Sequence, residues 1–219
     1  NAYLTTLELV KYASSQGINI SCDLNFRKKL WKWRPGTAPR DLAAECMGQI
    51  VPYVNWIICN EEDASDVFGI ASETSSIEEG KIDAEGYCGV ARRLLERFPK
   101  AEYVAITLRE SYSANHNNWG AMLYGRAEGK AFFAPNDANG EYHPYEIRNI
   151  VDRFGGGDSF GAGLIYALHS EEYRDPATAI RFAAAASCLK HTIHGDYNYV
   201  SLAEVVNLMN GSGSGRVMR

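Results

Sequence analysis

The sequence has no long apolar run and no excess of positive charge. No segment reaches the ~18 to 20 consecutive apolar residues of a membrane-spanning helix. Lys and Arg number 22 against 27 for Asp and Glu, a formal charge of −5, so no basic surface is expected to attract a polynucleotide. With 46% hydrophobic residues over 219 positions, the composition excludes a disordered chain and is typical of one soluble globular domain.

Cysteine is sparse and irregularly placed. The five cysteines are odd in number and form no CxxC pair, which argues against a disulfide framework and a zinc knuckle. The first six residues lack the charged-then-apolar pattern of a secretory signal. We therefore expect a non-secreted, cytoplasmic protein. The five cysteines are Cys22, Cys46, Cys59, Cys88 and Cys188, and most of them are expected in the core.

Helical and strand patterns alternate through the first half of the chain, starting with a helical pattern directly after Asn1. Gly17 ends the first helix and Pro39 opens the second. Three steps are predicted: helix 4–13 with strand 18–22, helix 41–51 with strand 54–59, and helix 85–98 with strand 103–107. A polar stretch, 72–81, is expected to form a surface loop. This alternation predicts an α/β fold with a mostly parallel sheet.

The pattern changes after residue 107. Gly125 and Gly129 flank the connection between two strand patterns, which predicts an antiparallel hairpin at one sheet edge. The predicted elements are hairpin strands 119–124 and 130–134, a strand 146–151, and helices 159–168, 177–191 and 201–209. The GSGSG sequence at 211–215 is typical of a flexible tail. We expect one domain over residues 1–210 and a tail over 211–219.

Three consecutive glycines, Gly155, Gly156 and Gly157, stand between the last predicted strand and a helix. Such a turn lets the backbone approach a ligand closely, and the helix that follows presents unpaired N–H groups to an anion. Asp158 would lie beside a bound phosphate, where its carboxylate could take a proton from an attacking hydroxyl. The alternative is a tight connection whose aspartate only caps the helix.

The sequence around this turn, DRFGGGDSF at 152–160, resembles the C-terminal signature of the ribokinase-like (PfkB) carbohydrate kinases, D-T-x-G-A-G-D-x-F. With GAGL after it, it looks most like the 2-keto-3-deoxygluconate (KDG) kinase branch. Arg153 and Gly156 depart from the pattern, where Thr and Ala are usual. The resemblance implies a three-layer αβα sandwich that uses ATP and Mg²⁺, with Gly155, Gly156 and Gly157 as the anion hole and Asp158 as the catalytic base.

A second segment, DLNFR at 23–27 with Leu30 and Trp31 behind it, resembles the D-x-N-x-R-x-x-L-W element of KDG kinases. The resemblance places Asn25 on the nucleotide side and implies that Arg27 binds phosphate or the sugar-acid carboxylate. A guanidinium suits both because it binds planar anions with two hydrogen bonds. The alternative is an ordinary solvated charge run at residues 27–29.

A third segment, Asn60 to Asp63, resembles the family's N-x-x-E element, which helps to place magnesium through water. Asp63 stands where Glu is usual, so its arm is shorter. Acidic residues in the first turn of a helix also complement the helix dipole, and simple capping is the alternative.

A fourth segment, TLRESY at 107–112, replaces the T-L-G-x-x-G turn of related kinases and is again similar to KDG kinase. The resemblance implies ATP contacts along it, whereas the alternative is a plain strand end. The residues are Thr107, Leu108, Arg109, Glu110, Ser111 and Tyr112.

Small residues at 183–188 form a helix face that, by the same resemblance, accommodates adenine near Ala185 and Cys188; tight helix packing is the alternative. Asp196 falls where these kinases place a residue near the sugar acid, and an exposed loop aspartate is the alternative. His191 and His194 have no third ligand nearby, so we expect ordinary surface histidines.

Full-length members of the family carry further N-terminal strands and a small β lid, and the chain therefore looks cut at its front. We expect the C-terminal portion of a kinase that phosphorylates a sugar acid, binds ATP and its substrate, and forms a possible homo-oligomer. One alternative is a noncatalytic nucleotide-binding fragment or regulatory module. Another is a kinase for a different sugar, such as fructose or ribose.

Overall fold

The computed structural model describes residues 2–60, 62–72 and 83–211, which form two compact units. The first unit comprises Asn1–Ile106 with Tyr124–Ala131, and the second Thr107–Leu123 with Phe132–Arg219. The predicted surface loop beyond Ser72 and the predicted tail beyond Gly211 lie outside the described residues.

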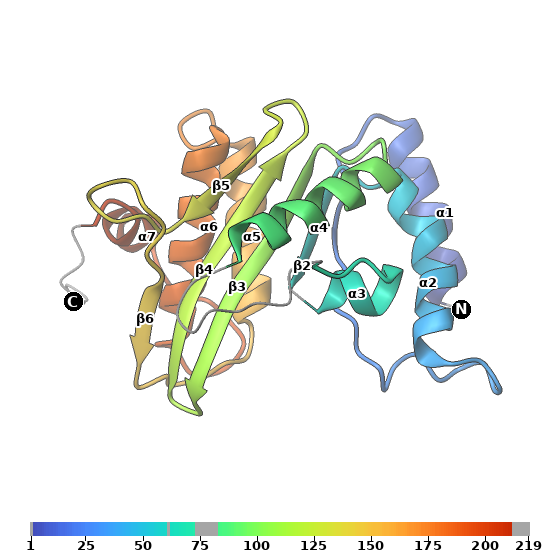
Figure 1. Ribbon diagram of the computed structural model, residues 1–219, viewed down its shortest axis with the longest axis horizontal. Coiled ribbons are helices and arrows are strands. Elements are labelled where there is room, and N and C mark those ends of the chain that lie inside the picture. The colour runs from blue at the N-terminus through green and yellow to red at the C-terminus, as the bar shows by residue number, and fades with distance from the viewer. Residues whose placement is uncertain (1, 61, 73–82, 212–219) are drawn as a thin grey trace. The chain divides into compact units, whose positions relative to one another are not determined.

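The helices and strands follow the predicted order (Figure 1). The elements up to the first long strand are α1 (Ala2–Ser15), β1 (Ser21–Asp23), α2 (Pro39–Ile50), the 3₁₀ turn η1 (Val51–Tyr53), β2 (Trp56–Asn60), α3 (Asp63–Phe68) and α4 (Ala84–Arg97). The later elements are β3 (Tyr103–Ser113), β4 (His116–Gly125), β5 (Lys130–Ala134), β6 (Tyr145–Arg148), α5 (Gly156–His169), α6 (Pro176–Lys190) and α7 (Leu202–Met209).

The strands form one mixed sheet in the order β1-β2-β3-β4-β5, with β6 paired to β4. β1 runs parallel to β2, with Ser21 opposite Trp56, and β6 runs antiparallel to β4, with Tyr145 opposite Trp119. A two-residue turn joins β3 to β4, the connection of an antiparallel hairpin. The sheet and its helices confirm the α/β class.

Local sequence explains the helix boundaries. Pro39 stands at the start of α2, where its missing N–H costs nothing. The Asp175 carboxylate caps α6 by accepting from Thr178 N at 3.1 Å. Ser201 and Glu204 form a reciprocal capping box at α7.

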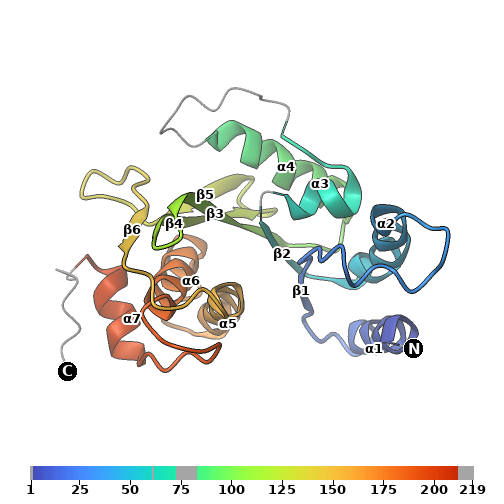
Figure 2. The ribbon, with the colours of Figure 1, turned by 90° about the horizontal axis from the view of Figure 1, so that it is seen from below.

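In the second unit, α5, α6 and α7 lie on one face of β4 and β6 (Figure 2). α5 packs closely on α6 at Gly163, where an added Cβ would lie 3.2 Å from Ala183 Cα and from Ala186 Cβ. The small residues of α6 therefore serve tight helix packing, one of the two readings of that tract. The alanines at 183–186 are all buried.

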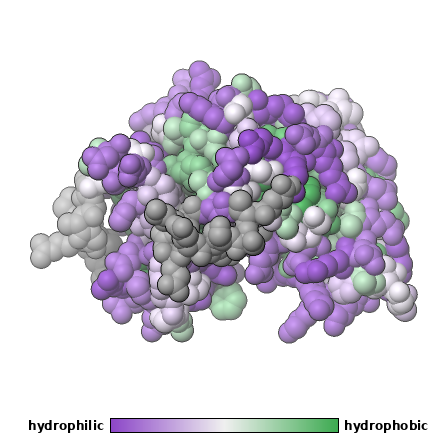
Figure 3. Space-filling model, viewed as in Figure 1, coloured by the Kyte–Doolittle hydropathy of each residue, from purple (hydrophilic) through white to green (hydrophobic). Residues whose placement is uncertain are grey.

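The surface is largely hydrophilic on the face drawn in Figure 3, with hydrophobic residues showing in limited areas. Among the described residues no helix is long and apolar enough to cross a membrane.

Two elements differ from the sequence prediction. β3 continues to Ser113, six residues beyond the predicted strand end, because TLRESY has no glycine to turn the chain and stays extended. α3 was not predicted as a helix; it is only six residues long, too short for a helical period to show.

Candidate functional site

The glycine turn lies between β6 and α5 in the second unit. Gly155 is the N-cap of α5 with φ +74°, the left-handed region that glycine adopts without strain. An added Cβ there would lie 2.2 Å from the backbone oxygen of Asp196, so space also requires glycine. Around Gly157, by contrast, an added Cβ meets nothing within 4 Å, which leaves the outer side of the turn open to a ligand.

Asp158 is exposed in the first turn of α5. In the part of the chain that the structure describes, no hydrogen bond or ion pair engages its carboxylate. The amide groups of the first turn have no acceptor within the helix, and the dipole of this 14-residue helix is positive at this end. The turn can therefore bind an anion beside an accessible carboxylate.

The Asp152 carboxylate joins the segment before the turn to the loop after α6. It accepts from Phe154 N at 3.0 Å and from Gly195 N at 2.8 Å. These backbone hydrogen bonds, with a smaller contribution from the charge of Lys190, lower the pKa of Asp152 below its ordinary value. His191 O accepts from Val151 N at 2.9 Å, so backbone and side chain both fasten the two segments.

Arg153, one of the two departures from the family signature, fastens the turn to the β3–β4 hairpin. Its guanidinium donates to the backbone oxygens of Ser113 and Ala114, both at 2.7 Å, and to Asn117 Oδ1 at 3.2 Å. The longer side chain thus has an anchoring role that threonine at this place could not fill.

Gly156, the other departure, lies against the imidazole of His191. An added Cβ would come 3.2 Å from His191 Cε1. His191 is 3% exposed and tilted against Trp119, and Ser187 O holds its Nδ1 at 2.9 Å. The expectation of a surface histidine was therefore wrong for His191, whereas His194 is exposed. Burial lowers the pKa of His191, which favours the neutral ring.

The backbone of Asp196 packs on Gly155 in the glycine turn. Asp196 is otherwise exposed. The second unit therefore brings Gly155, Gly156, Gly157, Asp158 and Asp196 together.

The first unit brings together the predicted residues of two other segments. Asp63 is buried, and its carboxylate accepts from Phe26 N at 2.8 Å and from Asn60 N at 3.1 Å. Asn60 Oδ1 in turn accepts from Glu62 N at 2.8 Å and from Asp63 N at 3.0 Å. The contacts of Asn60 lie at the start of α3, and the bond from Phe26 to Asp63 holds the segment that carries Asn25, at φ 34°, and the exposed Arg27.

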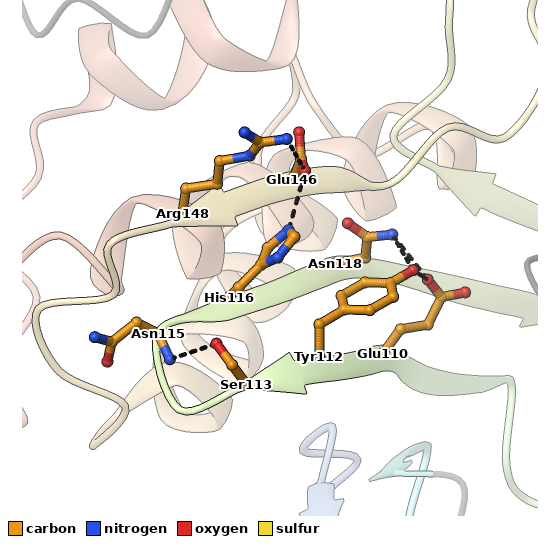
Figure 4. Close-up of polar contacts among 8 residues, drawn as sticks. All are labelled: Glu110, Tyr112, Ser113, Asn115, His116, Asn118, Glu146 and Arg148. Atoms are coloured by element: carbon orange, nitrogen blue, oxygen red, sulfur yellow. Dashed lines mark hydrogen bonds and ion pairs between the residues drawn. The ribbon is translucent and has the colours of Figure 1, made fainter.

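The strand β3 divides the TLRESY stretch between two faces of the sheet, because successive side chains alternate. Glu110 accepts from Tyr112 Oη at 3.0 Å and from Asn118 Nδ2 at 2.8 Å, on the face shown in Figure 4. The same face carries His116, whose Nε2 lies 3.0 Å from Glu146 Oε1. Thr107, Arg109 and Ser111 alternate with Leu108, Glu110 and Tyr112 and so point to the opposite face.

On α6, Ala185 is fully buried and Cys188 is partly exposed. Burial raises the pKa of the Cys188 thiol to about 12, so the thiol is neutral and unreactive near neutral pH.

Sequence reasoning missed the residues that support the turn: Asp152, Arg153, His191 and Lys190. For Asp152 and Arg153 the signal was present, since both lie in the signature itself. The burial of His191 and Lys190 at the end of α6 depends on tertiary packing, which no local pattern reports.

Comparisons with known proteins point to one family of carbohydrate kinases. The sequence model of the pfkB family carbohydrate kinases matches residues 126–201, which include the turn. Residues 126–201 thus resemble the PfkB carbohydrate kinases, and the α/β fold of the chain is shared with a solved 2-dehydro-3-deoxygluconokinase.

Three relatives describe the branch. The solved structure of 2-dehydro-3-deoxygluconokinase from Thermotoga maritima is 36% identical with a TM-score of 0.78, covering 95% of this chain and 55% of that one. A PfkB family carbohydrate kinase from Listeria grayi is 28% identical with a TM-score of 0.75, covering 95% and 55%. The curated 2-dehydro-3-deoxygalactonokinase of Haloferax volcanii is 25% identical over 211 residues, 96% of this chain and 53% of that protein. The chain thus spans about half the length of the relatives that it matches.

Proposed function

We propose that the protein catalyses ATP-dependent phosphorylation of a sugar-acid hydroxyl, with 2-keto-3-deoxygluconate converted to its 6-phosphate. The observation that carries this proposal is the glycine turn, open on its outer side at Gly157, with the accessible Asp158 carboxylate one residue further along. In the proposed reaction Asp158 takes the proton of the sugar hydroxyl as its oxygen attacks the γ-phosphorus, and the bond to ADP breaks. The amides of the turn stabilise the charge on the transferring group.

The substrate class follows from the relatives and from Arg27. Two relatives are named for 2-dehydro-3-deoxy sugar acids, one for the gluconate and one for the galactonate. Arg27 is exposed on the segment that Asp63 holds, and its guanidinium fits a carboxylate or a phosphate. Asp196, beside the glycine turn, is the proposed second contact to the sugar acid.

The residues present fit a nucleotide and, through water, magnesium. First-turn amides and a left-handed glycine suit a phosphate, and Asn25 with Thr107–Tyr112, Ala185 and Cys188 are the proposed further ATP contacts. The oxygens of Asp63 each accept one N–H, so a lone pair remains for a water bound to Mg²⁺. Among residues 2–60, 62–72 and 83–211 no group of three or more His, Cys, Asp and Glu could hold a metal ion directly. When bound, Mg²⁺ neutralises phosphate charge.

The test is ADP release with Mg-ATP and a panel of KDG, its galactonate epimer, fructose and ribose. We expect release with a 2-keto-3-deoxy acid, and a loss of about 10²-fold or more in kcat for Asp158→Asn with ADP affinity retained. Asp41→Asn, which changes the exposed first-turn aspartate of α2, is the matched control and should leave turnover unchanged. Turnover of Asp158→Asn near the wild-type rate would remove Asp158 from the base role.

The alternative is a noncatalytic nucleotide-binding module. ADP binding by calorimetry without product from any sugar in the panel would support that alternative. Release with fructose or ribose alone would instead assign another sugar-kinase specificity.

A further inference from the structure

A lysine is fully buried at the end of α6, behind the glycine turn. Lys190 is 0% exposed and its Nζ donates to Ile193 O at 3.1 Å. Burying an ammonium group is costly unless charge and hydrogen bonds compensate for the lost water. The hydrogen-bond partner of this buried ammonium lies in the loop after α6, which indicates a role in that loop.

Lys190 acts on both segments that build the turn. Its hydrogen bond fixes Ile193 in the 191–196 loop, and its charge favours the ionised form of Asp152 in the segment before α5. Asp152 reaches the same loop by accepting from Gly195 N at 2.8 Å. The cation and the carboxylate therefore hold one loop from two sides.

The loop in turn sets the position of the glycine turn. The backbone of Asp196 packs directly on Gly155, with no room for a Cβ between them. His191 O accepts from Val151 N at 2.9 Å. A shift of the 191–196 loop would consequently move the amides of Gly155 to Gly157, whose directions decide how well a phosphate is bound.

We propose that Lys190 is a positioning residue whose buried ammonium, by its hydrogen bond to Ile193 O, holds the 191–196 loop against the glycine turn and thereby orients the turn for phosphate. The proposal rests on the proposed function only for the identity of the anion. A neutral side chain would leave Ile193 O without its donor.

The first experiment measures amide hydrogen exchange at Gly195 and Val151, which donate to Asp152 and to His191 O, in the ligand-free protein, for wild type and Lys190→Met. We expect faster exchange at both amides in the variant, with the interior of α7 unchanged. Lys11→Met, which removes an exposed lysine of α1, is the control and should change neither amide. Unchanged exchange in Lys190→Met would overturn the proposal whether or not the protein is a kinase.

The second experiment measures ADP affinity by calorimetry. We expect Lys190→Met to weaken ADP about tenfold, the effect of one hydrogen bond to a charged group. Lys190→Ala should regain affinity when ammonium or methylammonium is added, because a small cation can enter the space left by the side chain. Tetramethylammonium is too large and should not restore binding. A purely structural role would give no such selective recovery, and its absence would overturn the proposal.

If Lys190→Met does not fold, Asp152→Ala tests the same loop from its other anchor, the hydrogen bond of Gly195 N to the partly exposed Asp152 carboxylate. This variant should speed hydrogen exchange at the Gly195 amide and lower the affinity for ADP. Unchanged exchange at Gly195 would contradict the proposal. Should wild type bind no ADP while the exchange results hold, the nucleotide function fails and the positioning role of Lys190 stands.

Discussion

Gly156 has no side chain, and the ring of His191 lies in the space that a side chain at position 156 would enter. Where the related signature has alanine, this chain has glycine, and the buried imidazole occupies the adjacent space. We infer that the two positions depend on each other, because either a methyl group at 156 or a ring at 191 fits, but both together are crowded.

This pairing predicts a rescue. Gly156→Ala should destabilise the protein by about 1 kcal/mol, since its Cβ would lie 3.2 Å from His191 Cε1 in a packed interior. In the His191→Ala background, Gly156→Ala should lower the free energy of unfolding by less than it does in wild type. Urea unfolding of the four proteins measures the coupling, and equal effects of Gly156→Ala in both backgrounds would contradict it.

At the scale of elements, helix patterns were predicted well. The periodicity located α1, α2, α4, α5, α6 and α7, and Pro39 marked the start of α2. The extension of β3 was missed because Arg109 and Tyr112 replace glycines that turn the chain in related sequences. The contacts of Asp63 to Phe26, far apart in sequence, could not be read from either segment alone.

The site was predictable to a similar degree. DRFGGGDSF located the turn and its aspartate from sequence, because glycine and a helix start carry local signals. The supporting contacts of Arg153 and Lys190 depend on how loops pack, and only the structure shows them.

Two helical glycines differ in their surroundings, and this gives a prediction about their replacement by alanine. Gly89 in α4 has nothing within 4 Å of an added Cβ, so Gly89→Ala should stabilise the protein by about 0.5–1 kcal/mol. Gly163→Ala should lower the unfolding free energy despite the same gain in helix propensity, because its Cβ would meet Ala183 Cα, part of a backbone that cannot move aside. Thermal and urea unfolding distinguish the two, and equal stabilisation would show that α6 can shift.

For the whole molecule, the buried His191 links stability to pH. Desolvation lowers its pKa, and the charges of Lys190 and Arg153 lower it further, against opposing hydrogen bonds to Ser187 O and Cys188 O. In the unfolded chain the pKa returns to its ordinary value of 6.5. Below that value the unfolded state binds the proton first, so this contribution to stability is complete above pH 6.5 and is lost as the pH falls toward the lowered pKa.

Urea unfolding across about pH 5 to 8 checks this linkage, in the range where histidine titrates. Carboxylates also titrate at the acidic end, so the informative quantity is the difference between wild type and His191→Gln. We expect the two unfolding free energies to converge as the pH falls below 6.5. Parallel curves would mean that His191 takes up its proton equally in both states.

Arg153 binds the hairpin through the main-chain oxygens of Ser113 and Ala114 and through the side chain of Asn117. Ala114 contributes only its carbonyl to this contact, and the residue is exposed. The side chain at position 114 can therefore be exchanged while the anchor is kept. A cysteine introduced there would accept a fluorescent dye on the hairpin that Arg153 joins to the glycine turn, and a change in the dye's emission on adding nucleotide would report the proposed binding in real time.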